Sequence, residues 1–167
     1  MDSYLQELKE SIASATRGMN LAELARHPEG KWSTAQVLEH LYLTYTGTLK
    51  GLERCLQKDR PLARLPTLKD RMRTAVVTGL GYLPEGRKAP QTATPRGMAA
   101  NEVMQAIGPA IVAMDEAIAQ CEAKFGLRTR LLDHPILGPL TGRQWRKFHW
   151  VHGQHHLKQI QRLRGGA

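Results

Sequence analysis

Hydrophobic residues recur every three or four positions over most of the chain, which is the period of amphipathic helices. Four long stretches and two short ones have this spacing, over residues 2–16, 33–57, 100–123, 141–163, 20–27 and 68–77. No stretch of useful length alternates between apolar and polar residues, so no strand is predicted. We therefore expect an all-α protein, with four main helices packed as a bundle and short helices in the connections.

Local signals place the ends of these helices. Residues 20–23, 33–36 and 141–144 have the spacing of capping boxes, in which two side chains bond each other's backbone N–H groups. Thr67 is placed to cap the short helix over residues 68–77. Pro109 is expected to kink its helix or to mark a later start.

Two segments are predicted to be irregular. Residues 79–98 contain many glycines and prolines and are expected to form a long loop of the kind that often serves as a lid. Residues 126–140 are expected to form a second loop.

Length and composition indicate one domain over residues 1–167, large enough for its own hydrophobic core. The most apolar stretch, residues 103–118, is too short and too polar to span a bilayer, so no membrane partner is expected. The N-terminus lacks the pattern of a signal peptide, which favours a cytoplasmic location. Cys55 and Cys121 fall on apolar helix faces and are expected to be inert core residues.

The formal net charge is +9. The basic residues are spread along the chain and form neither a tail nor a stretch interleaved with aromatic residues, so nucleic acid is not an expected partner. The resulting positive field would attract anionic small molecules.

Four of the seven histidines lie within residues 149–156. His152 and His156 are four apart and share the apolar face of the last helix, so both are expected to point into the bundle. His149 and His155 flank that face and are expected to be partly exposed.

His40 lies on the edge of the apolar stripe of the helix over residues 33–57, and it offers a third inward imidazole. Inward side chains on facing helices commonly build metal sites in bundles. Three neutral imidazoles suit Zn²⁺, Ni²⁺, Cu²⁺ or Fe²⁺ and leave a coordination position open, as in catalytic sites. The alternative is that each of these histidines is a hydrogen-bonded core residue.

Catalysis would also need an acid or a base. The candidates are Glu39, His134, His149 and His155. Glu39 is expected to be a solvated carboxylate on a helix surface, and His134 is either a turn residue or a functional one. Gln159 is either a partner of the metal-site histidines or polar packing.

The segment over residues 32–41, WSTAQVLEHL, together with the C-terminal pattern His152-x-x-x-His156-x-x-Gln159, resembles the DinB-like superfamily. Residues 134–141, Gln144-Trp145 and residues 155–157 resemble a subgroup of uncharacterised bacterial proteins within it. The resemblance implies an up-down-down-up four-helix bundle, often a homodimer, with a divalent metal ion on His40, His152 and His156. Some members of the superfamily are thiol transferases or isomerases that use a low-molecular-weight thiol such as bacillithiol or mycothiol.

Several functions follow from these patterns. The first is a metal-dependent transferase acting on a small molecule, with Zn²⁺ or Ni²⁺ and a low-molecular-weight thiol as cosubstrate. The others are a metal-dependent hydrolase, a non-catalytic metal-binding protein of a stress response, and a basic interaction protein whose histidines complete the core.

Overall fold

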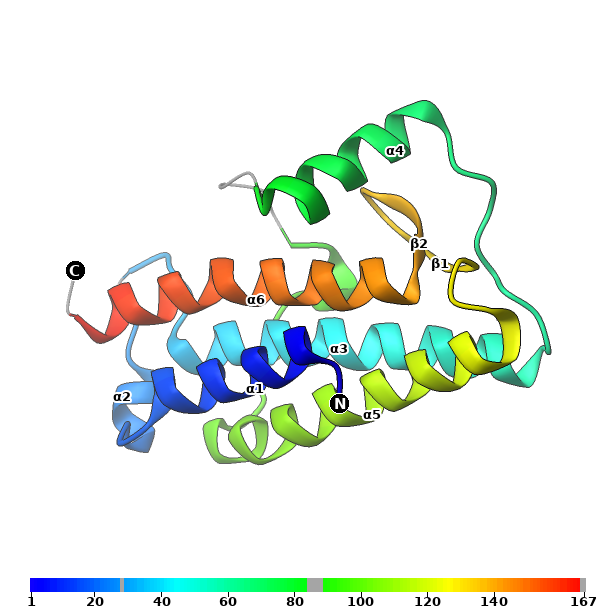
Figure 1. Cartoon of the computed structure of the whole chain (residues 1–167). Helices are drawn as coiled ribbons and strands as arrows, with labels where there is room; N and C mark the ends of the chain where they lie inside the picture. The colour runs from blue at the N-terminus through cyan, green and yellow to red at the C-terminus, as the bar shows by residue number, and fades with distance from the viewer. Residues whose placement is uncertain (28, 84–88, 166–167) are drawn as a thin grey trace.

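The computed structural model describes residues 1–27, 29–83 and 89–165 of the chain. Four long helices lie side by side in the body of the molecule (Figure 1): α1 (Ser3–Thr16), α3 (Thr34–Gln57), α5 (Ala100–Phe125) and α6 (Gly142–Arg164). Helix α3 packs along α5 and α1 packs along α6. Helices α1 and α6 run in one direction, and α3 and α5 run in the opposite direction (Figure 1).

Shorter helical elements fill the connections. They are α2 (Leu21–Ala25), α4 (Leu68–Thr74), the π-helical turn η1 (Ala75–Gly79) and the 3₁₀ turn η2 (Gln91–Ala93). The predominantly helical architecture expected from the sequence is therefore present.

The helix starts are where the capping patterns predict them. The side chains of Asn20, Ser33, Thr67 and Thr141 each accept a hydrogen bond from the backbone N–H three residues later. Pro109 lies inside the uninterrupted helix α5, so the expectation of a later start is wrong. Buried apolar residues on both sides of Pro109, from Val103 to Met114, hold the helix together across the missing N–H donor.

The prediction of an unstructured segment over residues 126–140 is also wrong. Strands β1 (Arg130–His134) and β2 (Gly138–Thr141) form an antiparallel hairpin that leads directly into α6. The strands are too short and too irregular to show an alternating pattern, because the register shifts between Arg130 and Leu132 and Pro139 lies within β2. Leu131 and Leu140 nevertheless face the core and are fully buried.

The core runs between the long helices and under the hairpin. Cys55 and Cys121 are both free thiols inside it, as predicted. Burial raises the pKa of both thiols, that of Cys121 to about 11. No helix in the described ranges is long and apolar enough to cross a membrane.

A largely buried ion network fixes the position of α6. The Arg146 guanidinium lies 2.6 Å from Asp115 Oδ1 and 2.6 Å from Glu122 Oε2, both on α5. The other oxygen of Asp115 accepts a hydrogen bond from the backbone N–H of Asp2, just before α1. Three of the long helices are thus joined around one cation, which belongs to the helix that carries most of the histidines.

Candidate metal centre

Three histidines from two helices meet in the interior. His40 lies on α3, and His152 and His156 lie one turn apart on α6. Their side chains are buried, with residue exposures of 4%, 8% and 9%. The Nε2 atom of His152 lies 3.2 Å from Nε2 of His40 and 3.1 Å from Nε2 of His156. The structure therefore brings together the three residues predicted from the sequence, and this cluster could hold a metal ion.

The outer nitrogens of two of these rings are held by oxygen atoms. His40 Nδ1 lies 2.7 Å from the carbonyl oxygen of Ala93, which can only accept, so Nδ1 carries the proton. His156 Nδ1 lies 3.1 Å from Gln159 Oε1 and donates to it in the same way. Both rings therefore direct the lone pair of Nε2 toward His152. Gln159 is a partner of the cluster, the first of the two roles considered for it.

The cluster cannot satisfy its own hydrogen bonds. A proton on His152 Nε2 can be donated to one neighbouring ring, which leaves the other Nε2 lone pair without a donor. The Nδ1 atom of His152 is buried and has no hydrogen-bond partner. A buried polar group without a partner is costly. A cation placed among the three Nε2 atoms would satisfy these three nitrogens, while the Nδ1 atom of His152 would keep its proton.

Two of the distances between the Nε2 atoms suit a small divalent ion. Zinc binds imidazole nitrogen at about 2.0–2.1 Å in tetrahedral geometry, which corresponds to nitrogen–nitrogen separations of about 3.3 Å. The two separations of 3.1 and 3.2 Å are close to that value. The ligand atoms of all three residues lie within 4.8 Å of one another.

Burial keeps these rings neutral, which is the form that binds metal. Desolvation lowers the pKa of His40, and it lowers that of His156 to about 4, with a further contribution from the nearby His40. The pKa of His152 is lowered well below its usual value by burial and then by its two histidine neighbours.

Glu39 is not the solvated surface carboxylate expected from the sequence. Its side chain is buried and accepts hydrogen bonds from the backbone N–H groups of Arg96 (2.6 Å), Gly97 (3.1 Å) and Met98 (3.0 Å). The segment before α5 lies over this part of α3, and the carboxylate satisfies three of its donors. Glu39 is therefore not available as a general base.

Glu39 and His40 together anchor residues 93–98 to α3, because Glu39 binds the end of this segment and His40 binds Ala93 at its start. The sequence predicts a long loop over residues 79–98, of which residues 84–88 lie outside the described ranges. The part after residue 90 begins with a 3₁₀ turn and is held against the histidine cluster.

His149 is also placed differently from the prediction. It is fully buried rather than partly exposed, and its Nε2 atom shares a hydrogen bond with Thr48 Oγ1 at 3.1 Å. The rings of Tyr45 and Trp145 pack against it. The helical period identified one inward face of α6, but α3 covers a wider arc of the helix. His155 is partly exposed, as predicted.

His134 has a clear local role at the end of β1. Its Nδ1 atom accepts hydrogen bonds from the backbone N–H groups of Ile136 and Leu137, both at 3.1 Å, and so closes the hairpin turn. Its ring packs on Phe148, with centroids 4.3 Å apart, and Phe148 in turn stacks on His152 at 5.5 Å. His134 is thus a turn residue one aromatic ring away from the histidine cluster.

Two contributors to the site were not identified from the sequence. Ala93 acts through its backbone carbonyl, which leaves no residue-type signature. The role of Phe148 in holding His152 depends on the rotamers of both rings. No pattern in the sequence could have revealed either contact.

The unfolding free energy of the metal-free protein should decrease as the pH falls. Burial lowers the pKa of His134 to about 4 and that of His149 to about 3. Below pH 6.5 the unfolded chain therefore takes up protons that the folded protein does not, and stability is lost between about pH 6.5 and 4. His134 and His149 each contribute at most about 1.4 kcal/mol per pH unit near pH 5, and the clustered histidines, whose pKa values are also lowered, add to this slope.

Urea unfolding of the metal-free protein at pH 7, 6 and 5 measures this slope. The variant His149→Gln, which removes one of these groups, should reduce the slope by up to about 1.4 kcal/mol per pH unit. An unfolding free energy that does not change over this range in the wild type would show that none of these rings is kept neutral by the fold.

Comparison with known proteins identifies a family. The model of the family described as "Protein of unknown function (DUF1569)" matches residues 4–163. No curated protein and no solved structure matches the chain. The matched region extends from α1 to the end of α6 and includes all three clustered histidines.

Proposed function

The chain belongs to the family "Protein of unknown function (DUF1569)", and we propose that it binds a divalent metal ion, Zn²⁺ or Ni²⁺, through His40, His152 and His156. The observation that carries this proposal is the meeting of three Nε2 atoms from two helices. The Nδ1 atoms of His40 and His156 donate to the oxygens of Ala93 and Gln159, and these hydrogen bonds fix the orientation of the two rings. Hydrogen bonds of this kind to the outer nitrogen are typical of metal-ligating histidines.

We propose further that the protein is a transferase for a low-molecular-weight thiol. Within the described residues, the cluster contains three imidazoles and neither a cysteine nor a carboxylate. Three protein ligands would leave a coordination position for an exogenous ligand, as in catalytic zinc sites. A divalent ion bound there would supply the positive charge that stabilises the deprotonated form of a small thiol.

The burial of the protein's two cysteines indicates that the thiol of the proposed reaction is not one of the protein's own. Cys55 and Cys121 are fully buried, and burial raises the pKa of both. Reactive cysteines have lowered pKa values and partial exposure. Neither residue can therefore serve as the nucleophile, so the thiol must come from solution, where the net charge of +9 would favour an anionic one.

The proposal includes an up-down-down-up four-helix bundle, which the directions of the long helices support, together with membership of the DinB-like superfamily and assembly as a homodimer. In this arrangement α3 and α6 supply the metal ligands. The ring of Phe148 would hold His152 in place, and residues 93–98 would cover His40.

Metal analysis of the untagged protein tests the first part of the proposal, with one divalent ion per chain expected. A conjugation assay with a bimane electrophile tests the second part, using bacillithiol, mycothiol and glutathione with the metal-loaded and the metal-free protein. Metal-dependent conjugation with one of these thiols is expected. Bound metal without conjugation would reject the transferase and leave a non-catalytic metal-binding protein or a hydrolase. Failure to bind any divalent ion would reject the whole proposal.

A further inference from the structure

A row of apolar side chains lies exposed on α4 and η1. Leu68, Met72, Val76 and Leu80 are four residues apart and all exposed, and Leu65 and Tyr82 extend the row at its two ends. We call these six residues the apolar ridge. Soluble proteins seldom expose so many large apolar residues together unless the surface binds something.

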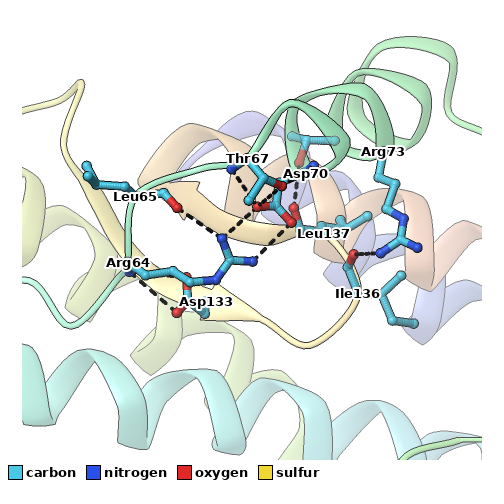
Figure 2. Close-up of polar contacts among 9 residues, drawn as sticks. Arg64, Leu65, Thr67, Asp70, Arg73, Asp133, Ile136 and Leu137 are labelled. Atoms are coloured by element: carbon cyan, nitrogen blue, oxygen red, sulfur yellow. Dashed lines mark hydrogen bonds and ion pairs between the residues drawn. The ribbon is translucent and has the colours of Figure 1, made fainter.

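The opposite face of α4 is firmly attached to the rest of the protein (Figure 2). The Arg64 guanidinium binds both carboxylate oxygens of Asp70, at 2.7 and 3.0 Å. The Thr74 hydroxyl donates to the carbonyl oxygen of Leu137, and Arg73 donates to that of Ile136.

Asp70 also fits closely over the hairpin. A Cβ atom on Gly138 would overlap with the Asp70 carboxyl group, and the φ of +77° at Gly138 is itself one that favours glycine. The inner face of α4 is therefore satisfied by the hairpin. Helix α4 lies on the side of the molecule away from α1 and α5 (Figure 1), and the ridge residues that it carries are exposed.

Basic residues predominate in the segment that carries the ridge. Residues 60–83 contain a single acidic residue, Asp70, which is buried and paired with Arg64. Lys69, Arg71 and Arg73 are exposed beside the ridge. The surface is therefore apolar along its centre and cationic along its flanks.

We propose that the apolar ridge is a docking surface for an anionic lipid bilayer. A helix with apolar residues on its outer face and basic residues beside them can lie in the plane of a membrane interface. Its cations would then meet the lipid phosphates while its apolar side chains enter the headgroup region.

Repulsion between like charges disfavours a second copy of the chain as the partner that binds the apolar ridge. Two such ridges would bring cationic flanks together, and each chain carries a net charge of +9. Binding of a membrane surface through the apolar ridge does not require a membrane-spanning helix. The proposal therefore differs from the expectation, made from the sequence, that the protein has no membrane partner. It is independent of the metal centre, since none of the clustered histidines belongs to the ridge.

Co-sedimentation of the full-length protein with vesicles tests the proposal. Vesicles of phosphatidylcholine alone are compared with vesicles containing phosphatidylglycerol as well. Binding to the anionic vesicles is expected, and Leu68→Ser with Met72→Ser should weaken it by on the order of tenfold. Lys69→Gln with Arg71→Gln should weaken it about fivefold for each charge removed.

Two matched variants control for the general properties of the chain. Leu127→Ser removes an exposed leucine from the loop after α5, and Arg17→Gln with Arg26→Gln removes two exposed cations from another part of the surface. Both should bind like the wild type. Helical content by circular dichroism should be the same in all variants.

Three results would overturn the proposal. The first is no sedimentation with anionic vesicles at low salt. The second is equal weakening by the ridge variants and by their controls, which would attribute binding to net charge alone. The third is self-association by light scattering that the ridge variants abolish while vesicles do not bind, which would assign the ridge to a second copy. If the wild type fails to bind vesicles and the ridge variants specifically lose capture of an acidic protein, the occupant is that protein and not lipid.

Discussion

Replacing His156 by alanine is expected to lower the affinity for a divalent ion by at least about 100-fold. The variant keeps two of the three ligands, and changing residues that merely orient metal ligands typically costs 10- to 100-fold in affinity. His40→Ala should have an effect of the same size, because its Nε2 atom meets the same His152 nitrogen from the other helix. Metal content after dialysis and competition with a chromogenic chelator measure the loss.

The matched control for this experiment is His155→Ala. His155 is the same residue type, next to His156 on the same helix, and is partly exposed outside the cluster. It should retain one ion per chain. His149→Ala is a poorer control, because His149 is fully buried and its removal would also affect stability. Equal loss of metal from His155→Ala and His156→Ala would mean that the ion binds elsewhere on α6.

Replacing Glu39 by alanine is expected to destabilise the protein by about 3 kcal/mol and to weaken metal binding as well. The change removes the acceptor of the backbone N–H groups of three consecutive residues, 96–98, and each net hydrogen bond contributes about 0.5–1.5 kcal/mol to stability. Release of this segment would also loosen Ala93, whose carbonyl orients His40. Chemical denaturation measures the stability, and the chelator competition measures the affinity.

Two further variants separate this effect from a change of charge or helix propensity. Glu53→Ala removes an exposed glutamate from the same helix and should change the unfolding free energy by less than about 0.5 kcal/mol. Glu39→Gln retains one acceptor oxygen and should fall between the wild type and Glu39→Ala. If Glu39→Ala has the stability of Glu53→Ala, the contacts to residues 96–98 do not stabilise the fold.

Features that depend on one helix alone could be predicted well. The capping residues predicted where α3 and α6 begin. The apolar period on α6 correctly predicted that His152 and His156 face the interior. The position of His40 at the edge of the stripe on α3 was sufficient to place it in the same cluster. These features follow from spacing, which is present in the sequence.

Features that depend on what covers a helix could not be predicted. Glu39 lies on a face that looks solvent-exposed on α3 alone, and it is buried because residues 93–98 return over it. His149 lies beside the apolar face of α6 and is buried because Thr48 and Tyr45 of α3 reach it. The hairpin was missed because its strands are brief and interrupted. In each case the deciding contact joins residues far apart in the chain.

The contact between His40 and His152 has a consequence for the equilibrium between the folded and the unfolded chain. These residues are separated by 112 positions. An ion shared between them would join two helices that are far apart in the sequence, and unlike a disulfide it would be released when the protein unfolds. An ion that binds only the folded form at 1,000 times its dissociation constant adds about 4 kcal/mol of stability. The abundance of the folded protein would then follow the availability of the metal.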